Sequence, residues 1–130
     1  MQLAAKAAHY LPNVEIIEQH HDKKLDAPSG TAIKTAELIR QARTEKPKPL
    51  DDKELLPGAR GAKLDDIPIH SVRLPGLVAK QQVIFGGKSE TLTIEHNSIH
   101  RESFMPGLLL ACQKVSALSA LHYGLDVVLD

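Results

Sequence analysis

Residues 14–32 read Val-Glu-Ile-Ile-Glu-Gln-His-His-Asp-Lys-Lys-Leu-Asp-Ala-Pro-Ser-Gly-Thr-Ala, which predicts a strand, a loop and the start of a helix. The strand, Val14 to His20, alternates with an apolar residue on each face, so it is expected inside a sheet. Ile16 and Glu18 share one of these faces. Ser29 can cap the turn that follows it, so a helix is expected to begin near this residue.

The same stretch concentrates the chemically useful side chains of the protein. The adjacent His20 and His21 can serve one cavity only if the strand ends there, because neighbouring strand residues point to opposite faces. An unperturbed imidazole titrates near pH 6.5 and can donate a proton, although an isolated histidine pair is more often structural. Lys24 and the backbone N–H groups at Ser29–Thr31 favour anions. Together these groups suit a small dianionic substrate that needs a proton.

Three other kinds of ligand site lack their sequence patterns. His96 and His100 have the spacing of a zinc-binding pair, but Asn97 stands where His-Glu-x-x-His requires glutamate, so no metal site is expected. Residues 87–89, Gly-Lys-Ser, imitate the end of a phosphate-binding loop, but Gln82 stands where the motif requires its first glycine. Gly-x-Gly-x-x-Gly occurs nowhere in the sequence, so the dinucleotide-binding fingerprint is missing.

The overall composition is that of one compact domain. The 130 residues include 16 lysines and arginines and 16 aspartates and glutamates, and this balance argues against a nucleic-acid partner. The single cysteine, Cys112, lies in an apolar run and is expected to be an inert packing residue. Neither a signal peptide nor an apolar run of about 20 residues is visible, so we expect a cytoplasmic protein with no membrane partner.

Two further helices are expected over Met1–Leu11 and Gly107–His122. Three further strands are expected over Ile67–Leu74, Val78–Phe85 and Glu90–Asn97. Residues Glu45–Asp66 are expected to form one long surface loop. The predicted order is α-β-α-β-β-β-α. This is an α+β domain with an open, mixed four-stranded sheet and helices packed on one face. The last helix is apolar on much of its circumference, so it is expected to be buried on two sides.

The segment Glu15–Ala32 resembles the signature of the dihydrodipicolinate reductase family, also called 4-hydroxy-tetrahydrodipicolinate reductase. The shared residues are His20-His21, Lys24 and the run Asp26-Ala-Pro-Ser-Gly-Thr-Ala32. The resemblance covers essentially the whole chain, with further matches at Arg60-Gly61, Ile69–Arg73, Gly86–Ser89, His96 and Arg101–Gly107.

The resemblance implies that residues 1–130 form a single substrate-binding and oligomerisation domain, without the family's nucleotide-binding Rossmann domain. Enzymes of this family reduce a cyclic unsaturated dicarboxylate to tetrahydrodipicolinate with NADH or NADPH, on the route to diaminopimelate and lysine. The resemblance also implies a homotetramer. The isolated domain is expected to bind no cofactor and to be inactive, and Leu125–Asp130 is expected to lack its usual contact with the nucleotide domain.

The resemblance also assigns roles to individual residues. His20 is the candidate acid/base group and His21 a substrate ligand. Lys24 is the candidate carboxylate ligand and a possible proton donor. A carboxylate of the substrate would bind to Ser29, Gly30 and Thr31. Arg101, next to the start of the last helix, is the candidate cofactor contact.

Several questions stay open at the level of sequence. Arg60, Arg73 and Arg101 are each more often solvated surface charges than ligands. The chain could be a stand-alone module that binds small carboxylates without catalysis. It could also be a purely structural assembly domain that uses the polar face of its hairpin, where Thr91 and Thr93 lie. Nothing in the sequence distinguishes NADH from NADPH.

Overall fold

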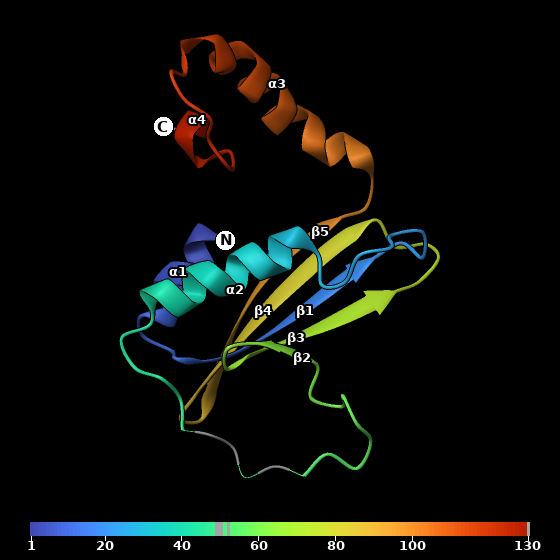
Figure 1. The fold of residues 1–130 in the computed structure, drawn as a ribbon, viewed down its shortest axis with the longest axis vertical. Helices are drawn as coiled ribbons and strands as arrows, with labels where there is room; N and C mark the ends of the chain where they lie inside the picture. Colours follow the sequence, from blue (N-terminus) through green and yellow to red (C-terminus); the bar gives the residue numbers. More distant parts are fainter. Residues whose placement is uncertain (49–50, 52, 130) are drawn as a thin grey trace. The chain divides into compact units, whose positions relative to one another are not determined.

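The computed structural model describes residues 1–48, 51 and 53–129, so Pro49, Leu50 and Asp52 of the predicted surface loop lie outside the described residues. The chain forms two compact units, Met1–Asn97 and Ser98–Asp130. The first unit contains a mixed sheet and two helices (Figure 1). Its elements are α1 (Gln2–Ala8), β1 (Asn13–His20), α2 (Gly30–Ala42), β2 (Ala62–Leu64), β3 (Ile67–Arg73), β4 (Ala79–Gly87) and β5 (Glu90–Ser98).

The sheet has the strand order β2-β3-β1-β4-β5. β1 runs parallel to β3 and antiparallel to β4, so the sheet is mixed and β1 lies inside it, as its two-sided apolar pattern predicts. The predicted α+β class is therefore confirmed, but the predicted count of four strands is wrong by one. The additional strand, β2, has only three residues, and a segment this short carries no alternation that could be recognised within the predicted loop.

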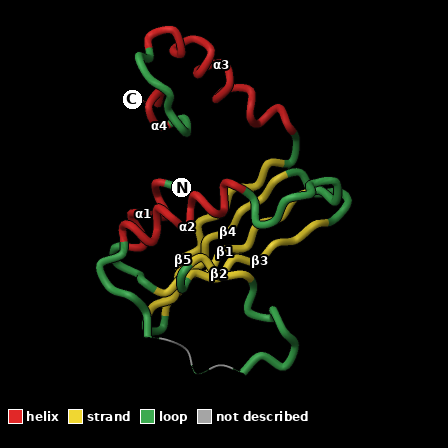
Figure 2. The backbone as a smooth tube through the Cα atoms, in the orientation of Figure 1, coloured by secondary structure: helices red, strands yellow, loops and turns green. Residues whose placement is uncertain are grey.

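The helices α1 and α2 lie side by side over one face of the sheet (Figures 1 and 2). Their small inward-facing residues, such as Ala4, Ala8 and Ala36, let the helices approach the sheet closely. The core cluster beneath them consists of Val14, Ile16, Ile39, Ile67, Ile69, Val83 and Phe85, together with the alanines. Burying an aliphatic or aromatic side chain of this size stabilises the fold by about 1.5–3 kcal/mol.

The second unit contains η1 (Arg101–Phe104), α3 (Met105–Lys114), η2 (Val115–Ala117) and α4 (Asp126–Leu129). The helix predicted to reach His122 therefore ends eight residues earlier than expected. Val115, Ser116 and Ser119 are weaker helix formers than the leucines and alanines before them. Beyond this point the chain folds back, and the Lys114 Nζ donates to the carbonyl of Val128 at 2.8 Å.

The expected burial of this last helix on two sides is also wrong. Leu108 and Leu109 are 53% and 62% exposed, and the Cys112 side chain is exposed rather than packed in a core. Apolar composition alone does not show which faces of a helix have neighbours. No helix among the described residues is long and apolar enough to cross a membrane.

Candidate functional site

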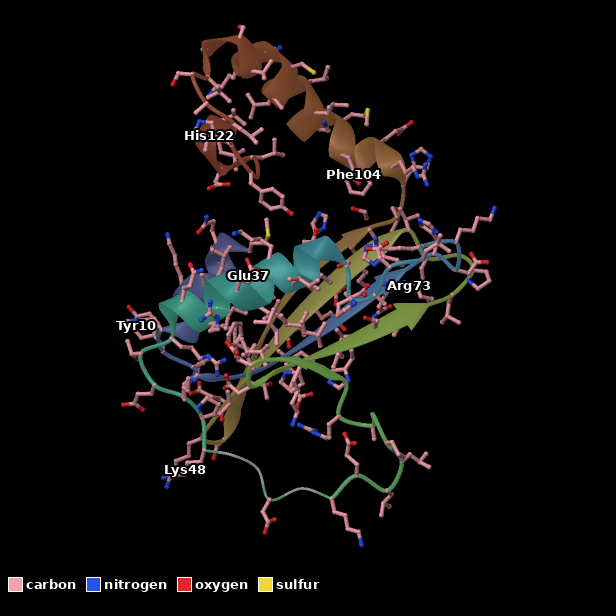
Figure 3. All side chains as sticks on the ribbon, in the orientation of Figure 1. Tyr10, Glu37, Lys48, Arg73, Phe104 and His122 are labelled. Atoms are coloured by element: carbon pink, nitrogen blue, oxygen red, sulfur yellow. The ribbon has the colours of Figure 1, made fainter. Side chains whose placement is uncertain are left out.

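The candidate site lies where the two parallel strands of the first unit end. His20, the last residue of β1, pairs in register with Arg73, the last residue of β3. The chain then turns through residues 21–28 into α2, whose N-cap is Ser29. Figure 3 shows the Arg73 side chain among the side chains that gather at this end of the sheet. In open sheets, the carboxyl ends of parallel strands commonly form binding crevices.

The carboxylate of Glu18 is at the centre of this arrangement and is fully buried. Its Oε1 accepts hydrogen bonds from the backbone N–H of Ser29 at 3.1 Å and from Arg73 Nη2 at 2.7 Å. Its Oε2 accepts from Arg73 Nη1 at 2.8 Å and lies 2.6 Å from His20 Nδ1. One carboxylate thus joins β1, β3 and the start of α2. Such pairing is what makes a buried charge tolerable.

These contacts shift the pKa values of the buried ion pair. Burial alone would raise the pKa of Glu18, but hydrogen bonds from Arg73, Ser71 and His20 outweigh it and hold this pKa below its usual value of 4.5. The hydrogen bond to Glu18 raises the pKa of Arg73 in turn. Both groups are therefore charged at neutral pH.

Lys24 is held by an internal carboxylate in the loop after β1. Its Nζ lies 2.8 Å from each carboxylate oxygen of Asp26, and this hydrogen bond lowers the Asp26 pKa. The backbone of the loop is fixed as well, because Arg73 Nη2 donates to the Asp26 carbonyl at 2.8 Å and Lys24 N–H donates to the His21 carbonyl at 3.1 Å. Lys24 is therefore connected to Glu18 through Asp26 and Arg73.

The start of α2 confirms the predicted cap. The Ser29 Oγ accepts a hydrogen bond from the Ala32 N–H at 3.2 Å, while the Ser29 N–H is used by Glu18. The N–H groups of Gly30 and Thr31 have no partner within the helix, as is usual in a first turn, and both residues are exposed. This turn can receive an anion through these two N–H groups and the Ser29 hydroxyl proton.

The structure therefore joins His20, Lys24 and Ser29 in one hydrogen-bonded network, with the half-buried His21 directly after β1. Arg101 is exposed at the start of η1, in the second unit. Among the described residues, no cluster of three or more His, Cys, Asp or Glu side chains could share a metal ion.

Sequence reasoning missed two members of the network, Glu18 and Arg73. A signal for Glu18 was present, because it shares a strand face with the apolar Ile16, and a charge on a buried face requires a partner. Nothing local identified Arg73 as that partner, since it lies 55 residues away. Its sequence context alone is that of a surface cation.

A hollow of about 580 Å³ lies elsewhere in the first unit. Its lining includes Glu15, Ile17 and Ile84, which by strand alternation belong to the other sheet face from Ile16 and Glu18. It contains none of the predicted site residues. The hollow is also lined by charged side chains, including Lys48, Arg60 and Lys63. We place the candidate site at the Glu18 network because a histidine, a lysine and a helix start meet there.

Comparison with known proteins assigns the chain to a family. A family model described as "Dihydrodipicolinate reductase, C-terminus" matches residues 1–129. The 4-hydroxy-tetrahydrodipicolinate reductase of Legionella pneumophila (strain Lens) is 60% identical over 129 residues, which are 99% of this chain and 53% of the relative. That of Geobacillus thermodenitrificans is 59% identical over 131 residues, covering 100% of this chain and 49% of the relative.

A solved structure supports the same assignment. It is a dipicolinate-bound dihydrodipicolinate reductase from Paenisporosarcina sp. TG-14, 53% identical in sequence, with a TM-score of 0.85 over 98% of this chain and 49% of that one. The chain spans about half the length of the curated relatives it matches. It belongs to the dihydrodipicolinate reductase family and corresponds to the C-terminal part of that enzyme.

Proposed function

We propose that this chain is the substrate-binding and assembly domain of a 4-hydroxy-tetrahydrodipicolinate reductase. The whole enzyme would reduce a cyclic unsaturated dicarboxylate to tetrahydrodipicolinate, in the cytoplasmic synthesis of diaminopimelate and lysine. The observation that carries the proposal is the Glu18 network, in which a histidine, a lysine and a helix start meet at one sheet end. The names of the relatives favour a reductase over a stand-alone carboxylate-binding module.

The two carboxylates of the substrate would bind at different places. One would take the N–H groups of Gly30 and Thr31 with the Ser29 hydroxyl, where the helix dipole favours an anion. The other would bind Lys24, which would exchange the exposed Asp26 carboxylate for that of the substrate. His21 would contribute a further substrate contact.

His20 would supply the proton of the reaction. Hydride addition to a conjugated imine builds negative charge on the substrate, and a nearby acid must neutralise it. The His20 side chain is only 17% exposed, so its proton transfer would be partly shielded from bulk water.

NADH or NADPH would provide the hydride when bound to the whole enzyme. This chain lacks the Gly-x-Gly-x-x-Gly turn that commonly binds a dinucleotide, and its one candidate contact, Arg101, is an exposed side chain outside the Glu18 network. We propose that the half of the enzyme not matched by this chain holds the cofactor, and that Arg101 at most contacts it from this domain.

Calorimetric titration with pyridine-2,6-dicarboxylate tests the proposal. Lys24→Ala should weaken binding about ten- to a hundredfold, because a charge-assisted hydrogen bond in a partly shielded site contributes about 1.5–3 kcal/mol. Lys23→Ala is the matched control, since it removes the same charge from the same loop at an exposed position. Lys23→Ala should reduce the binding free energy by less than about 1 kcal/mol, and this difference should disappear in salt.

Equal losses in the two variants would mean that the loop attracts anions only diffusely. No binding of the dicarboxylate to the unmodified chain would reject the proposed substrate site.

A further inference from the structure

We propose that Glu18 is a positioning residue that determines which ring nitrogen of His20 faces the substrate. This rests on the proposed function, in which His20 delivers the proton. Glu18 would hold a hydrogen on Nδ1 and leave Nε2 as the nitrogen that exchanges a proton with the ligand.

The first step of the argument is the chemistry of the contact. His20 Nδ1 lies 2.6 Å from Glu18 Oε2. An ionised carboxylate can only accept hydrogen bonds, so the hydrogen between these atoms belongs to the imidazole. In the neutral ring only one nitrogen carries a hydrogen, and Nε2 is then left without one. A carboxylate that orients a histidine from behind in this way fixes both its tautomer and its direction.

The second step is that the carboxylate itself cannot easily turn. Arg73 donates a hydrogen bond to each oxygen, from Nη1 to Oε2 and from Nη2 to Oε1, and this bidentate geometry fixes the plane of the carboxylate. The Ser29 N–H adds a third donor at Oε1. Glu18 is fully buried, so water does not compete for these positions.

The proton transfer balances with Glu18 unchanged. In the form that donates the proton, the His20 ring carries hydrogens on both nitrogens, and the Glu18 carboxylate would stabilise its charge. Once the substrate has gained hydride, which the cofactor of the whole enzyme would supply, the Nε2–H bond of His20 would break and its proton would bond to the electron-rich substrate atom. The electron pair of that bond stays on Nε2, and the ring becomes neutral with Nδ1–H retained.

The same sheet contains an internal control with the opposite geometry. On β3, His70 lies with Nε2, not Nδ1, 2.8 Å from Glu15 Oε2. The same reasoning assigns Nε2–H to His70. The two glutamates of these pairs lie three residues apart on β1, and their histidines should therefore hold opposite tautomers.

Nitrogen-15 NMR on the chain with labelled histidines measures the two tautomers directly, at a pH where both rings are neutral. The expected result is Nδ1–H in His20 and Nε2–H in His70, each favoured at least about tenfold over the other tautomer. An Nε2–H tautomer at His20 in the unmodified chain would overturn the proposal, whatever any variant does.

Glu18→Gln provides the second arm. The amide has one acceptor oxygen, which the Arg73 Nη2 and Ser29 N–H groups would retain, so its NH2 group would face His20 and donate to Nδ1. His20 should then invert to Nε2–H while His70 stays unchanged. Glu15→Gln, the matched control, should alter only His70. An unchanged His20 tautomer in folded Glu18→Gln would also overturn the proposal.

Added pyridine-2,6-dicarboxylate separates this inference from the proposed function. Ligand binding should shift His20 Nε2 and leave His70 unaffected. Calorimetric binding without any His20 shift would reject the positioning role but preserve the binding function. If the expected tautomers are found but no ligand binds, the proposed function is rejected. The assignment of Nδ1–H to His20, with Nε2 free of hydrogen, would still stand.

Discussion

Glu18 is charged and fully buried, so what it contributes to stability depends on its donors and on pH. Its pKa is depressed below 4.5 in the folded chain, and in the unfolded chain it returns to about that value. Its contribution to the free energy of unfolding is therefore complete above pH 4.5. It is lost as the pH falls through the depressed value.

We expect the unmodified chain to be more stable than Glu18→Gln at pH 7, and this difference to shrink steadily below about pH 4.5. Protonated Glu18 is neutral like glutamine, so the advantage of the ion pair with Arg73 disappears. Urea unfolding of both proteins between pH 7 and pH 3 measures the effect. Glu45→Gln controls for the loss of one negative charge at an exposed position. A difference that stays constant down to pH 3 would contradict the assignment.

The sequence predicted the local part of the site and failed on its long-range part. His20 and the Ser29 cap belong to one continuous pattern, so their places followed from strand alternation and capping chemistry. The pairing of Glu18 with Arg73 depends on the register of β1 against β3, and no short-range pattern encodes that register. The pairing of Lys24 with Asp26 is local, but many side-chain partners are possible in a charged loop.

At the scale of elements, the long strands and α2 were predictable because their periodicity is strong. The start of α2 at Ser29 and the central place of β1 agree with the structure. The three-residue β2 and the early end of α3 were not predictable, since the first depends on pairing with β3 and the second on competition among weak helix formers. A tertiary contact thus decided the first, and a balance of local propensities the second.

β2 also depends on the turn before it, which Gly61 makes possible. This glycine has a φ of +74°, and a Cβ built on it would lie 2.7 Å from the Ile69 carbonyl oxygen. Gly58 has a similar φ of +85°, but a Cβ there would meet nothing within 4 Å. The two glycines thus share the unfavourable backbone conformation and differ in the steric clash.

We expect Gly58→Ala to lose about 1–2 kcal/mol of stability, because only the left-handed conformation is penalised. Gly61→Ala should lose about a further 1–3 kcal/mol, since its methyl group also forces the strand backbone to move. Thermal or urea unfolding of both variants measures the difference. Equal losses would mean that the turn relaxes away from β3 at no cost.

At the scale of the whole molecule, the chain includes the proposed dicarboxylate-binding and proton-donating groups, but its sequence has no dinucleotide fingerprint. We expect the purified chain to oxidise neither NADH nor NADPH when the cyclic substrate is supplied, and absorbance at the nicotinamide band measures this. The control is the same assay with added nucleotide-binding half of a related reductase, which should restore turnover if the two halves associate. Turnover by the chain alone would show that this half holds the cofactor after all.

Assembly is the other property of the whole molecule, and the sheet face opposite Ile16 and Phe85 bears on it. Its charges are largely neutralised within the face. Lys80 lies 3.0 Å from Glu95, which also accepts a hydrogen bond from Gln82, and Glu15 pairs with Arg60 and His70. Paired charges cost less to bury than unpaired ones, because the attraction between the partners offsets part of their desolvation penalty, so this face can pack against another sheet more readily than one with unpaired charges.

The resemblance to the family implies a homotetramer. We expect the tetramer to use this face, and Thr93→Glu to reduce the mass to that of a smaller species. Thr93 is exposed and, by alternation, lies on the same face as Glu95. An added glutamate would bring like charges together between copies and would leave a carboxylate without a partner once buried. Because the site is exposed in the single chain, circular dichroism should show little change in fold.

Thr44→Glu, an exposed position just after α2, controls for the added charge and should leave the mass unchanged. Light scattering at micromolar concentration decides between these outcomes. A monomeric unmodified chain would contradict the tetramer, and a tetrameric Thr93→Glu would move the interface to another surface.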